Sequence, residues 1–275
     1  MTVQELFHSI RLAIESEDYA KLNDIQIFKP EKFNWVRDIF EPHNVAKFGN
    51  QKGLIWKYND QREDYTFQDL SDKYNQFLNF LRKNGINNGD KMFSQVPLLP
   101  ITWIGYLAAI KGGLIIIPAA TTLDARDLAF RFQSSFPEVA LADQASASKI
   151  DEAEAKFDQQ IKIKLISEGE REGWININDL WNESTNAGAA DTHSDDDLFY
   201  FFTSGTTGMP KVVVHTHYTY PVGGFTTSSW VGMKPGDLHY NISQPGWAKF
   251  FWSSFFSFWI LFSTILCYQA YKFVH

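Results

Sequence analysis

Short apolar runs alternate with helical stretches through the first half of the chain, and this order restricts the fold more than any other feature. The runs at 91–96, 114–117 and 139–141 have strand character, and helical stretches at 101–111 and from 123 onward separate them. Strands joined by long helices are typical of a parallel sheet that helices cover. The sequence therefore predicts an α/β fold with helix-covered, mostly parallel sheets.

Two helices are expected before this region. The first spans residues 3–15 and presents one apolar face, made of Val3, Leu6, Phe7, Ile10 and Ile14. A loop-rich stretch is expected from there to about residue 53, followed by a strand at 53–58 and a turn at 59–60.

The second expected helix has clear signals at both ends. Thr66 followed by Asp69 resembles an N-cap with an acidic residue in the first turn, and Gly85 suits the end of the helix. Between these positions the helix has a predicted buried stripe, formed by Leu70, Tyr74, Phe77, Leu78 and Leu81.

Acidic residues concentrate in the middle of the chain. Residues 143–197 contain 14 acidic and 5 basic side chains, a net charge of −9, while no acidic residue follows Asp237. The acidic stretch includes an expected strand at 161–166 and a polar segment at 182–197, predicted to be a surface loop between two lobes. We expect an N-terminal helical segment (1–29), a first α/β subdomain (30–190) and the truncated start of a second (191–275).

Overall charge and cysteine content exclude several classes of protein. The formal net charge of −7 argues against non-specific nucleic-acid binding. A single cysteine, Cys267, allows no internal disulfide and no zinc site of cysteine ligands. With no secretory signal pattern at the N-terminus, these features predict a reducing compartment, the cytoplasm.

The segment whose residue types most clearly predict a ligand lies between two expected strands at 198–203 and 212–216. Glycines in such a loop let backbone N–H groups approach an anion, hydroxyls add donors, and a lysine supplies positive charge to phosphate oxygens. The expected ligand is therefore a polyphosphate such as ATP. The contributing residues are Thr203, Ser204, Gly205, Thr206, Thr207, Gly208 and Lys211. Their spacing differs from that of a P-loop, and a strand rather than a helix follows, which disfavours a P-loop kinase.

Residues 200–217, YFFTSGTTGMPKVVVHTH, resemble the phosphate-binding signature of the adenylate-forming (AMP-dependent synthetase/ligase) superfamily. Shorter segments resemble it in the same order, and the resemblance runs from about residue 30 to the end. They are FNW (33–35), YTFQDL (65–70), GINNGD (85–90), LAAIKGG (107–113), KPGD (234–237) and GWAK (246–249). Within the superfamily, FNW and the PGWAKFFWSSFF segment most resemble acetyl- and medium-chain acyl-CoA synthetases.

The resemblance implies a ligase that uses ATP, Mg²⁺ and coenzyme A to activate a carboxylic acid. The acid attacks the α-phosphorus of ATP to give an acyl adenylate, and the thiol of coenzyme A then displaces AMP. By position, Thr203 to Gly208 and Lys211 are implied to hold the β- and γ-phosphates, with Thr206 and Thr207 as candidate Mg²⁺ contacts. His215, His217 and Trp247 are candidate substrate-site residues. Structural histidines and a core-packing tryptophan are the alternatives.

Enzymes of this superfamily are much longer, and their second half carries the ribose-binding aspartate and the catalytic lysine. The resemblance therefore predicts that this chain is an N-terminal portion. Turnover is expected to need the missing C-terminal half or a partner chain, and no catalytic residue is assigned in this half. The alternative is a catalytically incomplete remnant or a nucleotide-binding module of a truncated gene.

The C-terminal segment has an unusual composition, because residues 250–271 contain no charged side chain. That length could cross a bilayer, so a membrane anchor is one reading. Serines and tryptophans interrupt the segment, and a buried helix followed by a strand explains the apolar character without lipid. We favour the buried arrangement. The run 258–263 is bulkier than the turn that relatives usually have there.

Overall fold

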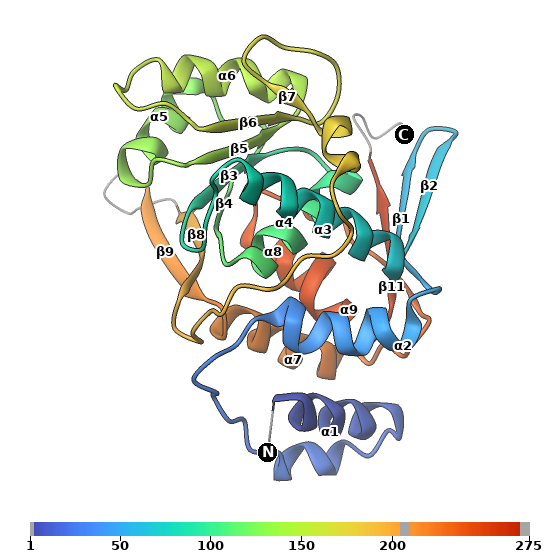
Figure 1. The fold of residues 1–275 in the computed structure, drawn as a ribbon. Coiled ribbons are helices and arrows are strands. Elements are labelled where there is room, and N and C mark those ends of the chain that lie inside the picture. Colours follow the sequence, from blue (N-terminus) through green and yellow to red (C-terminus); the bar gives the residue numbers. More distant parts are fainter. Residues whose placement is uncertain (1–2, 204–209, 270–275) are drawn as a thin grey trace.

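The computed structural model describes residues 3–203 and 210–269, which form two β-sheets covered by helices (Figure 1). The larger sheet has the strand order β7-β6-β5-β3-β4-β8-β9 and the smaller one β10-β11-β1-β2. Their bounds are β1 (Lys52–Tyr58), β2 (Gln61–Thr66), β3 (Lys91–Gln95), β4 (Ile115–Pro118), β5 (Val139–Ala142), β6 (Ile163–Ile166), β7 (Ile175–Asn176), β8 (Asp197–Thr203), β9 (Lys211–Thr216), β10 (Leu238–Tyr240) and β11 (Thr264–Tyr268).

Helices of several kinds connect these strands. The α-helices are α1 (Val3–Glu15), α2 (Ala46–Phe48), α3 (Phe67–Lys83), α4 (Pro100–Gly112), α5 (Ala125–Ser134), α6 (Gln144–Glu154), α7 (Thr219–Val231), α8 (Ala248–Phe251) and α9 (Ser257–Trp259). Two segments are 3-10 helices, η1 (Tyr19–Asp24) and η3 (Ile177–Asn182), and two are π-helices, η2 (Val36–Val45) and η4 (Trp252–Phe256).

Strand directions confirm the predicted α/β class. The pairs β3–β4, β3–β5, β5–β6 and β4–β8 are parallel, as are β1–β11 and β10–β11, whereas β1–β2 and β8–β9 are antiparallel. Each sheet combines strands from before and after residue 190. The sheets therefore do not divide the chain there, and the subdomain boundary stays a prediction.

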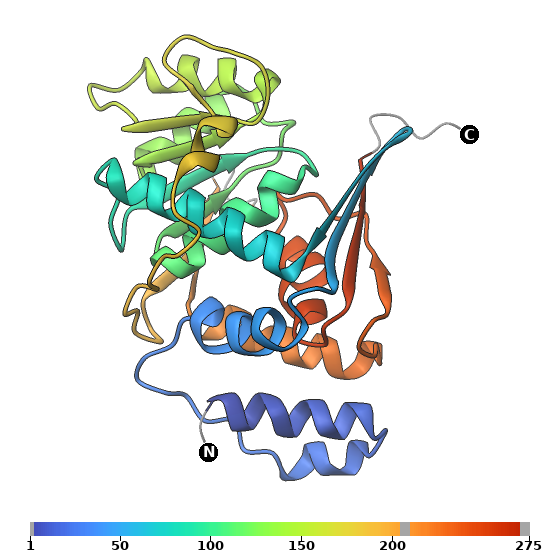
Figure 2. The same cartoon turned by 45° about the vertical axis from the view of Figure 1, so that its right-hand side comes forward.

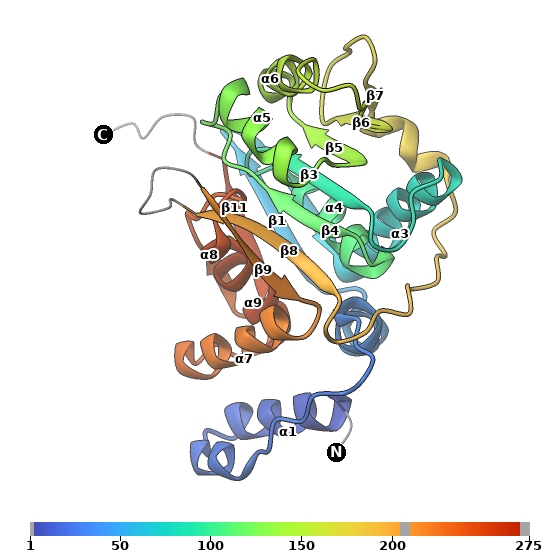
Figure 3. The same ribbon diagram turned by 90° about the vertical axis from the view of Figure 1, so that its left-hand side faces the viewer.

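Helices cover both faces of the larger sheet, because alternate residues of its strands face opposite ways. Met92 and Ile116 pack in the core that contains α3 and α4, while their neighbours Phe93 and Ile117 pack against α5 and α6. Figure 3 shows α5 and α6 on one side of these strands and α3 and α4 on the other. Being buried on both faces explains why these strands are continuous apolar runs.

The signals at the ends of α3 are confirmed. The Asp69 backbone N–H donates to Thr66 Oγ1 at 3.0 Å, and the Thr66 N–H donates to Asp69 Oδ2 at 2.9 Å, which is a capping box. Gly85 ends the helix with φ of +79°, a conformation that favours glycine. The predicted stripe is fully buried: Leu70, Tyr74, Phe77, Leu78 and Leu81 are at most 1% exposed.

Several elements are not predicted from the sequence, and three of them show why. Strand β2 was missed because its sequence, QREDYT, has no apolar alternation and its side chains are mostly exposed; pairing with β1 creates it. Helix α6 was missed because its buried face is mostly alanine and serine. The stretch expected to be rich in loops contains η2, which is helical despite Pro42 and buries Val36, Ile39 and Phe40.

The N-terminal helix α1 packs against the rest of the chain, below η2 in Figure 2. Leu6, Ile10 and Ile14 are buried as predicted, while the side chains of Val3 and Phe7 lie outside the described part. The Arg11 guanidinium sits 3.7 Å from the ring centroid of Phe262. Phe262 itself has a φ of +55°, so the bulky run at 258–263 turns through a conformation that is costly for phenylalanine.

The polar segment at 182–197 is more than a surface loop, because it is tied along α3. Asn75, Asn79 and Arg82 donate to the backbone carbonyls of Thr185, Ser184 and Gly188 at 2.9, 2.8 and 2.7 Å. Figure 1 shows this gold segment running down beside α3. The backbone carbonyls of the segment therefore accept hydrogen bonds from the polar side chains of this helix face.

The uncharged C-terminal segment is part of the protein core. Phe250, Phe251, Phe255, Phe256 and Trp259 are buried, and β11 follows them. The predicted buried helix followed by a strand is confirmed. Across residues 3–203 and 210–269, no helix has both the length and the apolar character needed to cross a membrane.

Candidate functional site

The β8–β9 hairpin brings together the two ends of the predicted phosphate-binding loop. Thr203 pairs with Lys211 at the end of the hairpin, and both side chains are exposed. The loop residues Ser204, Gly205, Thr206, Thr207 and Gly208 lie outside the described residues, so their roles stay predictions. Because β8 is parallel to β4, this loop begins at the carboxyl edge of the larger sheet, where open α/β sheets bind ligands.

Lys211 is well placed to bind an anion. Its side chain is exposed beside Thr203, and it forms no ion pair with any of the described residues. An exposed ammonium with no carboxylate partner is free to neutralise a phosphate oxygen.

Gly246 holds a second segment against the same edge of the sheet. A Cβ at this position would lie 2.2 Å from the Ala120 nitrogen and 2.5 Å from the Ala119 carbonyl carbon, so only glycine fits here. Ala119 directly follows β4, and Trp247 directly follows Gly246. Trp247 is 63% exposed, which contradicts the core-packing alternative. Its role in an acyl site stays a prediction.

The two histidines have different surroundings. The His215 ring packs 4.7 Å from the ring centroid of Tyr220, and burial lowers its pKa. His217 is completely buried, and burial lowers its pKa to about 4, so the ring is neutral near pH 7. The backbone N–H of His217 donates to the Asp196 carbonyl at 2.9 Å, at the opposite end of the hairpin from Lys211. This position favours the structural alternative for His217, and a substrate contact for either histidine stays a prediction.

Two buried polar groups at the carboxyl edge were not among the predicted site residues. Gln95, the last residue of β3, donates from Nε2 to the Ala120 carbonyl at 3.0 Å, while its Oε1 has no partner among the described residues. The Arg131 guanidinium lies 5.1 Å from the ring centroid of Phe202, one residue before Thr203. Burial lowers the pKa of Arg131. Only its polar character at a strand end could have singled out Gln95.

Carboxylate or histidine clusters that could hold a metal are not found within residues 3–203 and 210–269. The predicted Mg²⁺ contacts, Thr206 and Thr207, lie in the part that the structure does not describe.

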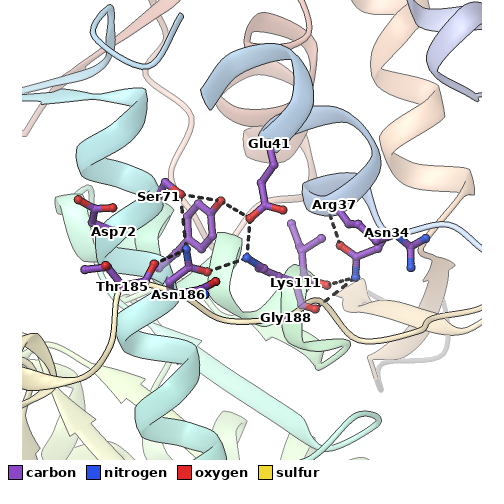
Figure 4. Close-up of polar contacts among 12 residues, drawn as sticks. Asn34, Arg37, Glu41, Ser71, Asp72, Lys111, Thr185, Asn186 and Gly188 are labelled. Atoms are coloured by element: carbon purple, nitrogen blue, oxygen red, sulfur yellow. Dashed lines mark hydrogen bonds and ion pairs between the residues drawn. The ribbon is translucent and has the colours of Figure 1, made fainter. Parts of the chain in front are cut away.

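An ion pair between the buried Lys111 and the half-buried Glu41 joins helices in the core (Figure 4). The Lys111 ammonium, on α4, pairs with Glu41 of η2 and donates to Asn75 Oδ1 of α3 at 2.7 Å. The Tyr74 hydroxyl also donates to Glu41, at 2.9 Å. Helix α4 in turn holds the C-terminal helices, since Trp103 Nε1 donates to the Ser254 carbonyl at 2.7 Å. The network thus joins η2, α3 and α4, and through α4 the C-terminal helices.

Residues 42–268 match the family of AMP-binding enzymes. This chain belongs to that family. It is 39% identical over 263 residues to 4-hydroxybutyrate–CoA ligase 1 of Metallosphaera sedula, covering 94% of this chain and 46% of the relative. It is 29% identical over 245 residues to the human mitochondrial acyl-coenzyme A synthetase ACSM3, covering 86% of this chain and 42% of the relative. The chain therefore spans less than half the length of these acyl-CoA synthetases.

Solved structures share the fold of this family member. The anthranilate CoA ligase AuaEII, crystallised in complex with anthranoyl-AMP, superposes with a TM-score of 0.79 at 22% identity, over 88% of this chain and 46% of that one. Acetoacetyl-CoA synthetase from Streptomyces lividans superposes with a TM-score of 0.77 at 17% identity, over 94% and 45%. At these identities the similarity shows the architecture, which is that of adenylate-forming enzymes.

Proposed function

We propose that this chain is the N-terminal part of an AMP-forming acyl-CoA synthetase, which activates a short- or medium-chain carboxylic acid to acyl-AMP and then to acyl-CoA. The observation that carries the proposal is the β8–β9 hairpin, which places Thr203 opposite Lys211, a lysine without an ion pair among the described residues, in a member of the AMP-binding family. The matched relatives named as CoA ligases support the choice of reaction. We expect the activity in the cytoplasm.

In this proposal the loop residues position ATP. Thr203, Ser204, Gly205, Thr206, Thr207, Gly208 and Lys211 hold the β- and γ-phosphates, and Lys211 neutralises the pyrophosphate as it leaves. Mg²⁺ arrives with the nucleotide and is contacted by Thr206 and Thr207. Exposed Trp247, held at the same edge by Gly246, lies beside the acid. Positioning and charge neutralisation are what this chemistry needs from a protein.

Turnover is proposed to need the portion that corresponds to the second half of the relatives, in the same polypeptide or in a partner chain. Exposed apolar residues on one edge strand of each sheet support this. Val212 to Val214 on β9 are 38–46% exposed, and Leu238 and Tyr240 on β10 are 56% and 47% exposed. Apolar edge strands are surfaces that proteins normally cover. Thioester formation by the purified 275-residue chain alone would contradict this requirement.

The phosphate site is tested by replacing Lys211 with alanine. Loss of one charged contact to phosphate is expected to weaken MgATP binding about tenfold or more, measured by calorimetry. Lys162→Ala removes another exposed lysine, which directly precedes β6, near the edge of the larger sheet opposite the hairpin. This variant should leave the affinity for MgATP unchanged. Equal affinities for the wild type and Lys211→Ala would remove Lys211 from the site.

A further inference from the structure

A separate groove, of about 340 Å³, lies between α3, the start of α4 and η3. The apolar side chains of Leu99, Ile101, Ile104, Ile177 and Trp181 line part of its wall, and polar residues line the rest. In Figure 1 the gold turn of η3 lies on the side of the molecule away from β9, so the groove is distinct from the hairpin site. Its volume is that of a small-molecule pocket.

Two positive features line this groove. The Lys73 ammonium lies 4.3 Å from the ring centroid of Trp181 and forms no ion pair with the residues that the structure describes. The N-terminus of α4 also opens here, because Leu99 provides no side-chain cap and Pro100 begins the helix. A helix N-terminus carries partial positive charge and favours an anion. The ammonium and the helix end thus both favour a negatively charged ligand.

One acidic residue borders the groove and sets a limit on this attraction. Glu168 is exposed and accepts a hydrogen bond from Ser167 Oγ at 3.1 Å. Lys73 is half-buried against the Trp181 ring, so its charge is less screened by water than that of Glu168. Glu168 therefore weakens the attraction for an anion, but the groove still favours an anion over a cation.

We propose that this groove binds a small organic anion with an apolar body. The anionic group lies against Lys73 and the start of α4, and the apolar part lies along Ile101, Ile104 and Trp181. The proposal does not depend on the nucleotide site, because none of the groove residues belongs to the β8–β9 hairpin.

The test uses 1-octanesulfonate, which has the required charge and apolar body and cannot be adenylated as a carboxylate can. Its binding to the 275-residue chain is followed by calorimetry. Lys73→Met keeps the apolar stem and removes the charge. We expect it to weaken binding by about fivefold or more, the effect of losing one partly screened charge contact. Lys83→Met, on the same helix but paired with Glu183, is the matched control and should bind as the wild type does.

A second variant removes a negative charge, so it should change the affinity in the opposite direction from Lys73→Met. Glu168→Gln should tighten binding about twofold to threefold by removing the repulsive charge. The proposal is overturned if the wild type binds no octanesulfonate at 10 mM, a concentration well above typical small-molecule affinities. It is overturned equally if Lys73→Met and Lys83→Met bind alike. Binding lost in Lys211→Ala but kept in Lys73→Met would place the probe at the nucleotide site instead.

Discussion

Replacing Glu41 by leucine is expected to lower the free energy of unfolding by about 3–5 kcal/mol. The Lys111 side chain is only 4% exposed, and Glu41 is its counter-charge. Without Glu41, a buried ammonium would keep Asn75 Oδ1 as its hydrogen-bond acceptor but lose its compensating charge. The Tyr74 hydroxyl would lose its acceptor as well. Urea unfolding of the two proteins measures the difference.

A double variant separates the charge from the packing. Glu41→Leu with Lys111→Met removes both charges and fills the space with apolar atoms, which often costs little. We expect the double variant to be more stable than Glu41→Leu alone by about 2 kcal/mol or more, since coupled buried charges are strongly non-additive. A double variant no more stable than Glu41→Leu alone would show that the ion pair does not stabilise the contact between these helices.

Replacing Trp259 by alanine is expected to cost about 3–5 kcal/mol, the range for a fully buried aromatic side chain. Trp259 packs between the rings of Phe40 and Phe255, with centroids at 5.1 and 4.8 Å. Its Nε1 donates to the Gly53 carbonyl at 3.0 Å, which ties the C-terminal helices to β1. The cavity would therefore open in the middle of the shared core.

The matched control is another tryptophan from the same segment. Trp247 is 63% exposed, so Trp247→Ala should change the free energy of unfolding by no more than about 0.5 kcal/mol. Urea denaturation of both variants gives the comparison. Similar losses for the two would mean that the C-terminal segment does not pack as described.

Local patterns predicted the parts of the fold that depend on neighbours in sequence. The ends and buried stripe of α3 follow from Thr66, Asp69, Gly85 and their periodic apolar residues, which act within one helix. The parallel strands were predictable because burial on both faces makes them apolar runs. Strand β2 was not, since nothing in QREDYT distinguishes a strand until β1 lies beside it.

The same distinction applies to the functional regions. The phosphate-binding loop is a compact sequence pattern, so its residues could be named from the sequence. The Lys111–Glu41 pair joins positions 70 residues apart, one of them in a stretch that was expected to be loop. Gly246 is needed because of Ala119 and Ala120, far earlier in the chain. Such requirements arise only when distant segments meet.

Hydrogen exchange with and without MgATP tests the central claim most directly, because it locates the nucleotide on the chain. The account predicts slower amide exchange in peptides that cover β8, the loop and β9, with residues around Gly246 and Ala119 as the next to respond. Protection confined to other parts of the molecule, or no protection at saturating MgATP, would contradict the proposal that this hairpin binds the phosphates of ATP.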